Sequence, residues 1–280
     1  MCKKASNNIL IIFLKIVNFY IFSNLHVSFA VFGLVKITLL EIGISENKTA
    51  WFVFFSTLFS YNTIRFLRLN TSKNWYSDWI TNNIKILYFI SGIGFVGFVY
   101  YGFQLRLKAI LILIPFAITT FFYVFPFDRM SLRNIPALKL FLIAFSWAGI
   151  SVFFPLTQNY MNIHSTDWIT FIQRFLFVIV ITLPFDIRDV NYDSIKLKTL
   201  PQLLGIKKTK HIGFLFLFLF FSLEFFKLNL QTNAIINLII ISILSGILLY
   251  FTTKNQSKYY SAFLVESLPI VWWVLVYSSL

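Results

Sequence analysis

Nine apolar runs divide the chain, and each is about as long as an α-helix needs to be to cross a membrane. A hydrocarbon core about 30 Å thick takes roughly 20 helical residues at a rise of about 1.5 Å each. The runs are continuous, without the alternation of polar and apolar positions typical of a membrane β-barrel, so helices are predicted. They cover approximately Leu14–Leu40, Thr49–Arg65, Ile84–Phe103, Ala109–Phe125, Ala137–Leu156, Trp168–Phe185, Ile212–Phe226, Ala234–Thr252 and Tyr260–Tyr277.

The polar segments between these runs are short except at two places, which fall on the same side of the predicted bundle. One follows the second run, from about Arg65 to Asn83, and the other follows the sixth run, from about Asp186 to His211. Long connections in a compact domain are often functional. No boundary for a second domain is visible, so residues 1–280 are predicted to form a single transmembrane domain. Lys15 interrupts the first run, which we therefore interpret as an uncleaved helix rather than a signal peptide.

The composition agrees with a membrane location. Hydrophobic residues make up 58% of the chain and charged residues 12%, and Phe alone occurs 36 times. A soluble domain is about 25% charged. These values exclude a soluble globular enzyme, a disordered chain and a disulfide scaffold. The predicted fold class is an all-α integral membrane protein, a bundle of about nine transmembrane helices.

The net charge of +14 is distributed unevenly between the two sides of the predicted bundle. Most basic residues outside the runs fall on the side of the N-terminus and the two long connections, whereas Lys48, Arg106, Lys108 and Lys227 fall on the other. Cytoplasmic loops of membrane proteins carry an excess of Lys and Arg. We therefore predict a multi-pass protein of the inner (cytoplasmic) membrane, with a cytoplasmic N-terminus and a C-terminus on the opposite side. The positive charge is thereby explained without a nucleic acid partner.

A short acidic stretch after the sixth run is the main candidate for chemistry. The chain has ten acidic residues, and Asp186, Asp189 and Asp193 are spaced i, i+3 and i+7. On a helix this spacing puts the three carboxylates on one face, where they repel one another unless a cation lies among them. Oxygen ligands and nearby lysines suit Mg²⁺ together with phosphate groups. The alternative interpretation is a solvated helix end whose carboxylates pair with those lysines.

Basic and hydroxyl side chains follow the acidic stretch directly, at Lys196, Lys198 and Thr199. A metal ion with adjacent cations is an arrangement that binds a diphosphate. The Asp-x-x-Asp-x-x-x-Asp pattern after the sixth run, then Lys-Thr-Leu-Pro and Gly205, on a chain of nine apolar runs, resembles the UbiA superfamily of intramembrane aromatic prenyltransferases. The resemblance covers nearly the whole chain in topology. One departure is that the stretch from Asp193 to Thr199 is about one residue shorter than in that family.

The resemblance implies a mechanism and a set of site residues. In that family, Asp-rich motifs after helices 2 and 6 face a central cavity that opens to the cytoplasmic side, and they hold Mg²⁺ against the diphosphate of a polyprenyl donor. The resemblance thus implies a bundle of about nine transmembrane helices around such a cavity. On this basis Asp186, Asp189 and Asp193 are the expected catalytic and Mg²⁺-binding residues, and Lys198 is an expected diphosphate ligand. The implied partners are a polyprenyl diphosphate donor, a lipophilic or aromatic acceptor and membrane lipids.

The first Asp-rich motif of that family is degenerate here. Asn62 fits its leading Asn, but the three carboxylate positions fall on Thr63, Phe66 and Asn70. Residues 63–66 (Thr-Ile-Arg-Phe) nevertheless parallel residues 186–189 (Asp-Ile-Arg-Asp), which indicates a weak internal repeat with one copy stripped of its acids. The alternative is a chance Asn near a helix end.

Two basic residues lie between the positions of the missing acids. Arg65 lies one helical turn after Asn62, with Arg68 close by. A guanidinium group contacts phosphate oxygens directly and bidentately. We therefore expect Asn62, Arg65 and Arg68 to contact the diphosphate, with the arginines replacing the charge of one metal ion. The alternative is that both arginines are ordinary anchors on the cytoplasmic side and that catalysis is lost.

Further charged residues lie near the fourth, fifth and ninth runs. Arg133 and Lys139 follow Tyr123 in a segment where the resembling family has a Tyr and then basic residues, and both are expected to contact the diphosphate. For Lys139 the alternative is that its side chain extends to the lipid headgroups. Glu266 lies inside the ninth run, where a charge needs a partner or a wet cavity, and it has no predicted role.

The predicted function is the Mg²⁺-assisted transfer of a polyprenyl group from an allylic diphosphate to an aromatic or other lipophilic acceptor. A second hypothesis is a catalytically silent homologue that binds a polyprenyl lipid or diphosphate, or acts as a membrane scaffold. The third, a small-solute transporter, is disfavoured because transporters place polar residues at the membrane midplane, whereas here they gather on one side.

Overall fold

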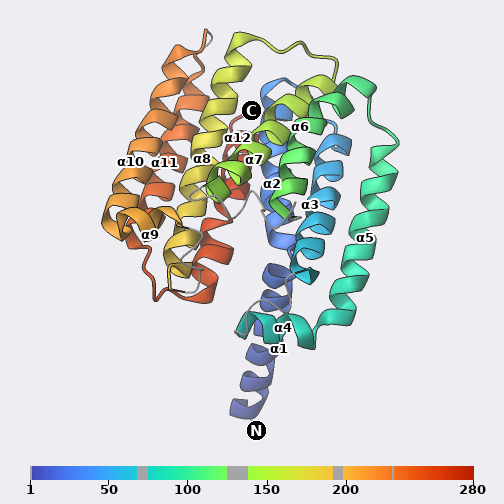
Figure 1. The fold of residues 1–280 in the computed structure, drawn as a ribbon, viewed down its shortest axis with the longest axis vertical. Helices are drawn as coiled ribbons and strands as arrows, with labels where there is room; N and C mark the ends of the chain where they lie inside the picture. Colours follow the sequence, from blue (N-terminus) through green and yellow to red (C-terminus); the bar gives the residue numbers. More distant parts are fainter. Residues whose placement is uncertain (1, 68–74, 125–137, 192–197, 229) are drawn as a thin grey trace.

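The computed structural model describes residues 2–67, 75–124, 138–191, 198–228 and 230–280, and these residues form a bundle of helices without strands (Figure 1). The prediction of an all-α fold is therefore confirmed. The elements are α1 (Cys2–Phe22), α2 (Leu25–Glu41), α3 (Lys48–Phe66), α4 (Trp75–Asn82), α5 (Ile84–Gly102), α6 (Leu107–Val124), α7 (Leu138–Gln158), α8 (Ser165–Asp189), α9 (Leu200–Leu204), α10 (Ile206–Ser222), the short η3 (Leu223–Phe226), α11 (Thr232–Phe251), η4 (Tyr260–Val265) and α12 (Leu268–Ser278).

The first predicted helix, Leu14–Leu40, is wrong as a single element. It is broken at Ser23 and Asn24, where α1 and α2 meet at an angle of 55°. Asn24 has a φ of 69°, in the left-handed region that Asn tolerates better than most residues because its short side chain bonds locally. Both residues of the break are buried. The break therefore brings polar groups into the interior of the bundle.

The predicted number of nine membrane crossings is not confirmed. Within the described residues, six helices are long and apolar enough to cross a membrane, or seven if the bent pair Ile12–Phe22 and Leu25–Glu41 counts as one span. The segment Leu107–Phe122 in α6 is apolar but shorter, and α3 is not among the six. The chain is thus a multi-pass helical membrane protein, and nine crossings remain a prediction.

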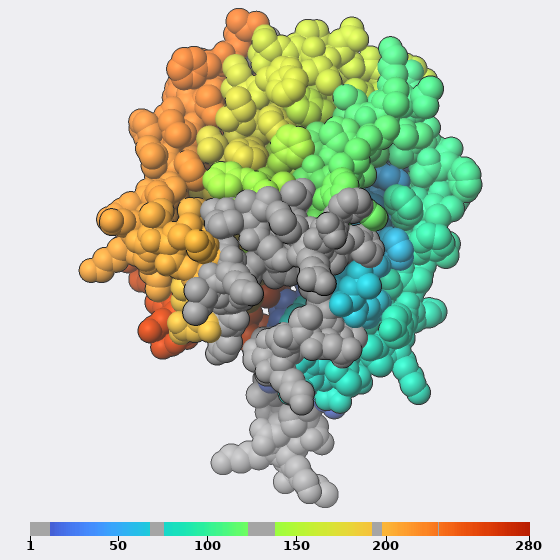
Figure 2. All heavy atoms as spheres, in the orientation of Figure 1, coloured from blue at the N-terminus to red at the C-terminus, as the bar shows by residue number. Residues whose placement is uncertain are grey.

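Helix α2 lies at the centre of the bundle. It packs against α3, α7 and α12, while α8 packs between α7 and α10. Gly33 permits the close approach of α2 to α12, because a Cβ atom there would lie 3.2 Å from the carbonyl oxygen of Pro269. Helices α5 and α10 form opposite flanks (Figure 2) and expose large apolar side chains such as Phe89 and Phe218, as expected of surfaces that face lipid.

Two further features of the topology position the site. Helices α3 and α8 end on the same side of the bundle (Figure 1), and we call this side the motif end. The last apolar run is also interrupted, because the π-helical turn Tyr260–Val265 is followed by Glu266 and Ser267 before α12 begins. π-Turns inside helices occur frequently at functional sites.

Candidate active site

The acidic stretch forms the last turn of α8. Asp186 and Asp189 lie one helical turn apart, and Asp186 is only 4% exposed. The helix thus extends beyond the predicted end at Phe185 and carries both carboxylates on the bundle itself. Asp193 lies outside the described residues. Of the three predicted carboxylates, the structure therefore describes two.

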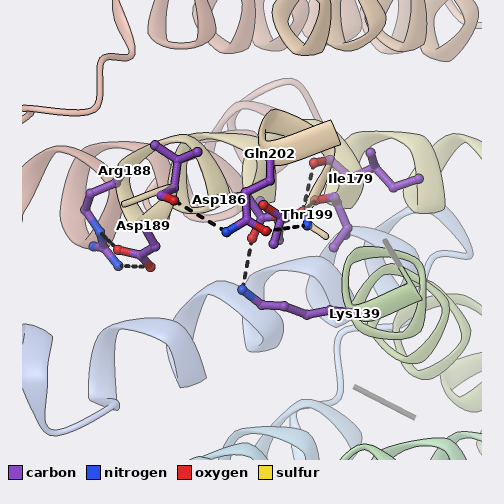
Figure 3. A network of polar contacts seen from close by, with 10 residues as sticks. Lys139, Ile179, Asp186, Arg188, Asp189, Thr199 and Gln202 are labelled. Atoms are coloured by element: carbon purple, nitrogen blue, oxygen red, sulfur yellow. Dashed lines mark hydrogen bonds and ion pairs between the residues drawn. The ribbon is translucent and has the colours of Figure 1, made fainter. Parts of the chain in front are cut away.

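Each of these two carboxylates is already paired with a cation (Figure 3). Lys139 Nζ, at the start of α7, lies 2.9 Å from Asp186 Oδ1. Arg188 donates from Nε and Nη2 to the two oxygens of Asp189, at 2.8 and 2.9 Å. Lys139 therefore does not extend to the headgroups but holds the end of α8 against α7. Arg188 was not among the predicted site residues.

Asn62 of α3 is fully buried and all its amide atoms are engaged. Its Oδ1 accepts a hydrogen bond from Asn24 Nδ2 at 3.0 Å, and its Nδ2 donates to the carbonyls of Ser23 and Leu58 at 3.1 and 2.9 Å. Such a network fixes its members, because an unpaired buried amide costs about 1–3 kcal/mol. Asn62 thus joins α3 to the break between α1 and α2.

Arg65 lies one turn further along α3 and is tied to the same break. Its Nη2 donates to Asn24 Oδ1 at 2.6 Å, and its Nη1 donates to the carbonyl of Phe22. Its guanidinium carbon lies 4.8 Å from the ring centroid of Tyr76 in α4, whose hydroxyl also hydrogen-bonds to Arg65. Contacts from the end of α1, from the break and from α4 thereby position the guanidinium. The sequence did not predict these contacts. Arg68 and Arg133 lie outside the described residues.

Tyr76 supplies a neutral partner to Arg65. Burial raises the pKa of Tyr76 above its ordinary value of 10.0; Glu266 also raises it, while Arg65 and Arg188 lower it. The phenol is therefore protonated at neutral pH and accepts a hydrogen bond from Arg65 without cancelling the positive charge.

Lys198 is exposed beside the end of α8. Thr199 begins α9 with a capping arrangement, in which its backbone nitrogen donates to Gln202 Oε1 at 3.0 Å. Gln202 Nε2 in turn donates to the carbonyl of Val190 at 3.4 Å. These contacts hold the start of α9 against the end of α8, so Lys198 lies on the same side as the acidic stretch.

A cavity of about 720 Å³ lies between α3, α5, α6 and α7. Its lining reaches from Thr63, near the motif end, to Leu105 in the connection between α5 and α6. Helix α5 packs on α3 and α6 packs on α7, and the α6 lining includes the exposed side chains Ile110, Ile114 and Phe121. Hydroxyl groups at Ser56, Ser60 and Ser146 interrupt an otherwise mainly apolar wall. A chamber of this size and lining suits a lipophilic ligand.

Asp186 and Asp189 are the candidate Mg²⁺ ligands that the structure describes at the motif end. Among the described residues, no group of three or more His, Cys, Asp and Glu side chains is placed to hold a metal ion. Mg²⁺, however, commonly takes one or two carboxylates and completes its shell with water and substrate phosphates. Asp186 and Asp189 offer oxygen ligands of that kind, so their chemistry fits Mg²⁺ bound together with a diphosphate.

Two solved structures are similar to this chain in fold. No protein-family model matches the chain, and no curated protein matches its sequence. Among solved structures, the chain is similar to a UbiA homologue from Aeropyrum pernix K1, with a TM-score of 0.66 and 13% identity over 91% of this chain and 97% of the other. It is also similar to a digeranylgeranylglyceryl phosphate synthase, with a TM-score of 0.58 and 14% identity over 95% and 97% of the two chains. The chain therefore has the fold of the UbiA-type prenyltransferases.

Proposed function

We propose, from the premise of a UbiA-type fold, that the protein transfers a polyprenyl group from an allylic diphosphate to an aromatic or other lipophilic acceptor in the membrane. One observation carries the proposal: Asp186, Asp189 and the cations Lys139, Arg188 and Arg65 gather at the motif end of a bundle that also contains a large, mainly apolar cavity. Charged and lipophilic binding regions in one bundle suit a substrate with a diphosphate head and a prenyl tail.

The cations anchor the diphosphate in this proposal. Lys139 and Arg188 exchange part of their contact with the aspartates for contact with phosphate oxygens, and Arg65 and Lys198 approach from α3 and from the start of α9. Arg guanidinium groups are suited to this role because their planar donors bind phosphate bidentately. Asn62 acts indirectly, since it holds Asn24, which holds Arg65. Arg68 and Arg133 remain proposed phosphate ligands outside the described residues.

Asp186, Asp189 and Asp193 would hold Mg²⁺, which when bound supplies Lewis-acid stabilisation of the leaving diphosphate. The abundance of basic residues around the motif end leads us to place this end on the cytoplasmic side of the membrane. An aqueous diphosphate head would then reach the site from the cytoplasm, while its tail remains in the bilayer.

The reaction proposed is a heterolytic substitution at the allylic carbon. The C–O bond to the diphosphate breaks, and its electron pair leaves with the diphosphate, whose growing negative charge Lys139, Arg188 and Arg65 stabilise. The acceptor donates an electron pair to the allylic cation to form the new bond and then loses a proton. The products are the prenylated acceptor, diphosphate and a proton. The apolar wall of the cavity limits the access of water that would otherwise capture the cation.

A pyrophosphate-release assay tests the function. Purified protein in detergent is supplied with Mg²⁺, geranyl and longer allylic diphosphates, and a panel of aromatic acceptors. We expect release from the wild type, at least about 100-fold slower release from Asp186→Ala because a charge-organising group at the leaving group is lost, and little change in Asp78→Ala, an exposed acid of α4. Normal turnover by Asp186→Ala would contradict the proposal.

A silent, ligand-binding homologue is the second candidate function. It is favoured by the degenerate first motif and by the fact that Asp186 and Asp189 are both paired within the protein. It predicts that allylic diphosphates bind but that no pyrophosphate is released with any acceptor. Release from any allylic donor would exclude it.

A further inference from the structure

An open groove follows the outer seam between α10 and α11, which lie side by side on one flank of the bundle (Figure 1). It is separate from the cavity between α3, α5, α6 and α7. Its volume is about 600 Å³, and its lining side chains lie between positions 214 and 221 of α10 and between positions 239 and 251 of α11. The walls are mainly apolar, and the rim residues Phe218 and Ile243 are 65% and 56% exposed. The groove therefore opens on the surface that faces lipid.

The length of this groove matches the depth of one leaflet. The twelve residue steps from Ile239 to Phe251 correspond to about 18 Å at a helical rise of about 1.5 Å. Half of a hydrocarbon core is about 15 Å thick. Phe251 is the last residue of α11, so the groove extends from the motif end towards the middle of the bundle. Gly246 contributes to its wall, and a Cβ atom there would lie 3.4 Å from Phe214 Cε1. An acyl chain of one leaflet fits these dimensions.

Lysines lie around the motif end of the groove. Lys210 Nζ donates to the backbone carbonyl of Tyr250 at 2.6 Å and lies 5.9 Å from the centroid of the Tyr250 ring, which lines the groove. Lys207 precedes Phe214 by seven residues, so both lie on the same face of α10. Lys254 follows the end of α11 by three residues. We call Lys207, Lys210 and Lys254 the lysine cluster.

The lysine cluster has no compensating acids. Between positions 198 and 258 the sequence contains one acidic residue, Glu224, which lies at the other end of α10 and pairs with Lys227 at 2.8 Å. Among the described residues, no ion pair of 4.0 Å or shorter involves the lysine cluster. The first turn of α10 has no acid either, so these charges add to the positive end of the helix dipole. They thus do not stabilise α10, and their arrangement favours an external anion.

We propose that the groove and the lysine cluster bind an anionic phospholipid from the leaflet at the motif end. An acyl chain occupies the groove, and the headgroup phosphate contacts Lys207, Lys210 and Lys254. Basic pockets between transmembrane helices bind acidic lipid headgroups. An excess of lysine on the cytoplasmic side is general in membrane proteins, but it does not require lysines at the mouth of an apolar groove. The inference goes beyond the proposed function and does not depend on it.

Other occupants of the groove predict different binding. A lipid held by apolar contact alone binds without regard to the charge of its headgroup. A free phosphate ion held by the lysines alone binds independently of the groove. A second copy of the chain covers the groove in a dimer. An anionic phospholipid alone requires both the lysine cluster and the open groove.

The first experiment measures headgroup selectivity. Dissociation constants of phosphatidylglycerol and phosphatidylcholine with identical acyl chains are determined for purified protein in detergent by native mass spectrometry. The wild type should bind phosphatidylglycerol at least about tenfold more tightly, because each lysine near an anionic headgroup contributes roughly fivefold. In Lys207→Gln/Lys254→Gln this preference should fall below about threefold. Lys48→Gln/Lys108→Gln, which removes two exposed lysines that start α3 and α6, is the matched control and should keep the preference.

The second experiment tests the groove. Gly246→Leu adds a side chain to its wall, and leucine is a better helix former than glycine, so the fold should be retained. Gly92→Leu on α5 is the matched control, since a Cβ atom at Gly92 meets nothing within 4 Å. We expect Gly246→Leu to weaken the binding of both lipids at least about threefold, and Gly92→Leu to leave it unchanged.

A preference for phosphatidylglycerol that is lost in Lys207→Gln/Lys254→Gln and kept in its control, with weaker binding by Gly246→Leu, supports the inference. Equal binding of the two lipids by the wild type overturns it, as does unchanged binding by Gly246→Leu. Displacement of phosphatidylglycerol by inorganic phosphate, or a dimer in detergent that Gly246→Leu dissociates, overturns it in favour of a free anion or a second copy. If Gly246→Leu does not fold, the selectivity of the wild type and of the lysine variants decides. None of these outcomes changes the expected release of pyrophosphate, so the proposed function is tested separately.

Discussion

Lys139 Nζ lies 2.9 Å from Asp186 Oδ1, so the start of α7 is joined to the end of α8 by an ion pair whose side chains are 18% and 5% exposed. The pair explains how a lysine is accommodated at the start of an otherwise apolar helix. It also means that the first carboxylate of the acidic stretch is not free in the ligand-free protein. A diphosphate or metal ion at this place must compete with an existing partner.

Breaking this pair on one side should destabilise the protein. Lys139→Met leaves the Asp186 carboxylate buried without its cation, for which about 3 kcal/mol is the expected loss in the free energy of unfolding. The measurement is denaturant unfolding in detergent, with Lys108→Met, an exposed lysine of α6, as the control. Adding Asp186→Asn to Lys139→Met should recover part of the loss. Equal stability of Lys139→Met and the wild type would show that the pair has no energetic role.

The buried amide network predicts a second effect on stability. Asn62→Leu removes the partners of Asn24 Nδ2 and of the Ser23 carbonyl, and unsatisfied buried polar groups cost about 1–3 kcal/mol each. The thermal midpoint should fall by several degrees relative to the wild type, whereas Asn82→Ala, at the exposed end of α4, should leave it unchanged. A midpoint unaffected by Asn62→Leu would argue against the network as the anchor of Arg65.

Filling the cavity should weaken the binding of lipophilic substrates and leave the binding of the diphosphate headgroup unchanged. Ser60 lines the cavity, and Ser60→Phe adds a ring to its wall. We expect binding of a long allylic diphosphate to weaken at least about tenfold, since the loss of well-packed apolar contact is worth more than 1.4 kcal/mol. Binding of inorganic pyrophosphate should be unchanged. Ser257→Phe, on an exposed position outside the cavity, provides the control. Equal weakening of both ligands would place the effect on folding rather than on the cavity.

The raised pKa of Tyr76 predicts an alkaline response. Its proton is held more tightly in the folded than in the unfolded protein, so this contribution to stability is complete below pH 10.0 and is lost as the pH rises through the higher folded-state pKa. A difference titration of phenolate absorbance, wild type minus Tyr76→Phe, should have its midpoint above pH 10.0. A midpoint at or below that value would show that the guanidinium groups outweigh the burial of the phenol.

Much of the fold was predictable because apolar runs of membrane length leave few alternatives to helices. The ranges predicted for α5 and α11 differ from the observed ones by only a few residues. The break at Asn24 was missed because a polar pair inside an apolar run can be tolerated in a straight helix. Its location depends on partners in α3 that a linear pattern does not reveal.

The candidate site was predictable as a set of residues but not as a set of pairs. The spacing of Asp186, Asp189 and Asp193 predicted one helix face; Asp186 and Asp189 both lie in the last turn of α8, and Asp193 lies outside the described residues. That Lys139 would meet Asp186, or that Arg65 would bond to Asn24 and Phe22, depends on contacts between positions some 40 residues or more apart. A single sequence contains no signal for such pairings.

Helix α5 packs on α3 and helix α6 packs on α7, and this arrangement determines the units in which the affinity of a ligand for the cavity should be expressed. The cavity between these helices is bordered by the exposed α6 side chains Ile110, Ile114 and Phe121, which belong to the lipid-facing surface. A strongly lipophilic ligand that enters here comes from the bilayer, so its occupancy follows its mole fraction in the membrane rather than its concentration in water. Dilution with inert lipid should then reduce apparent saturation even when the total amounts of protein and ligand are held constant.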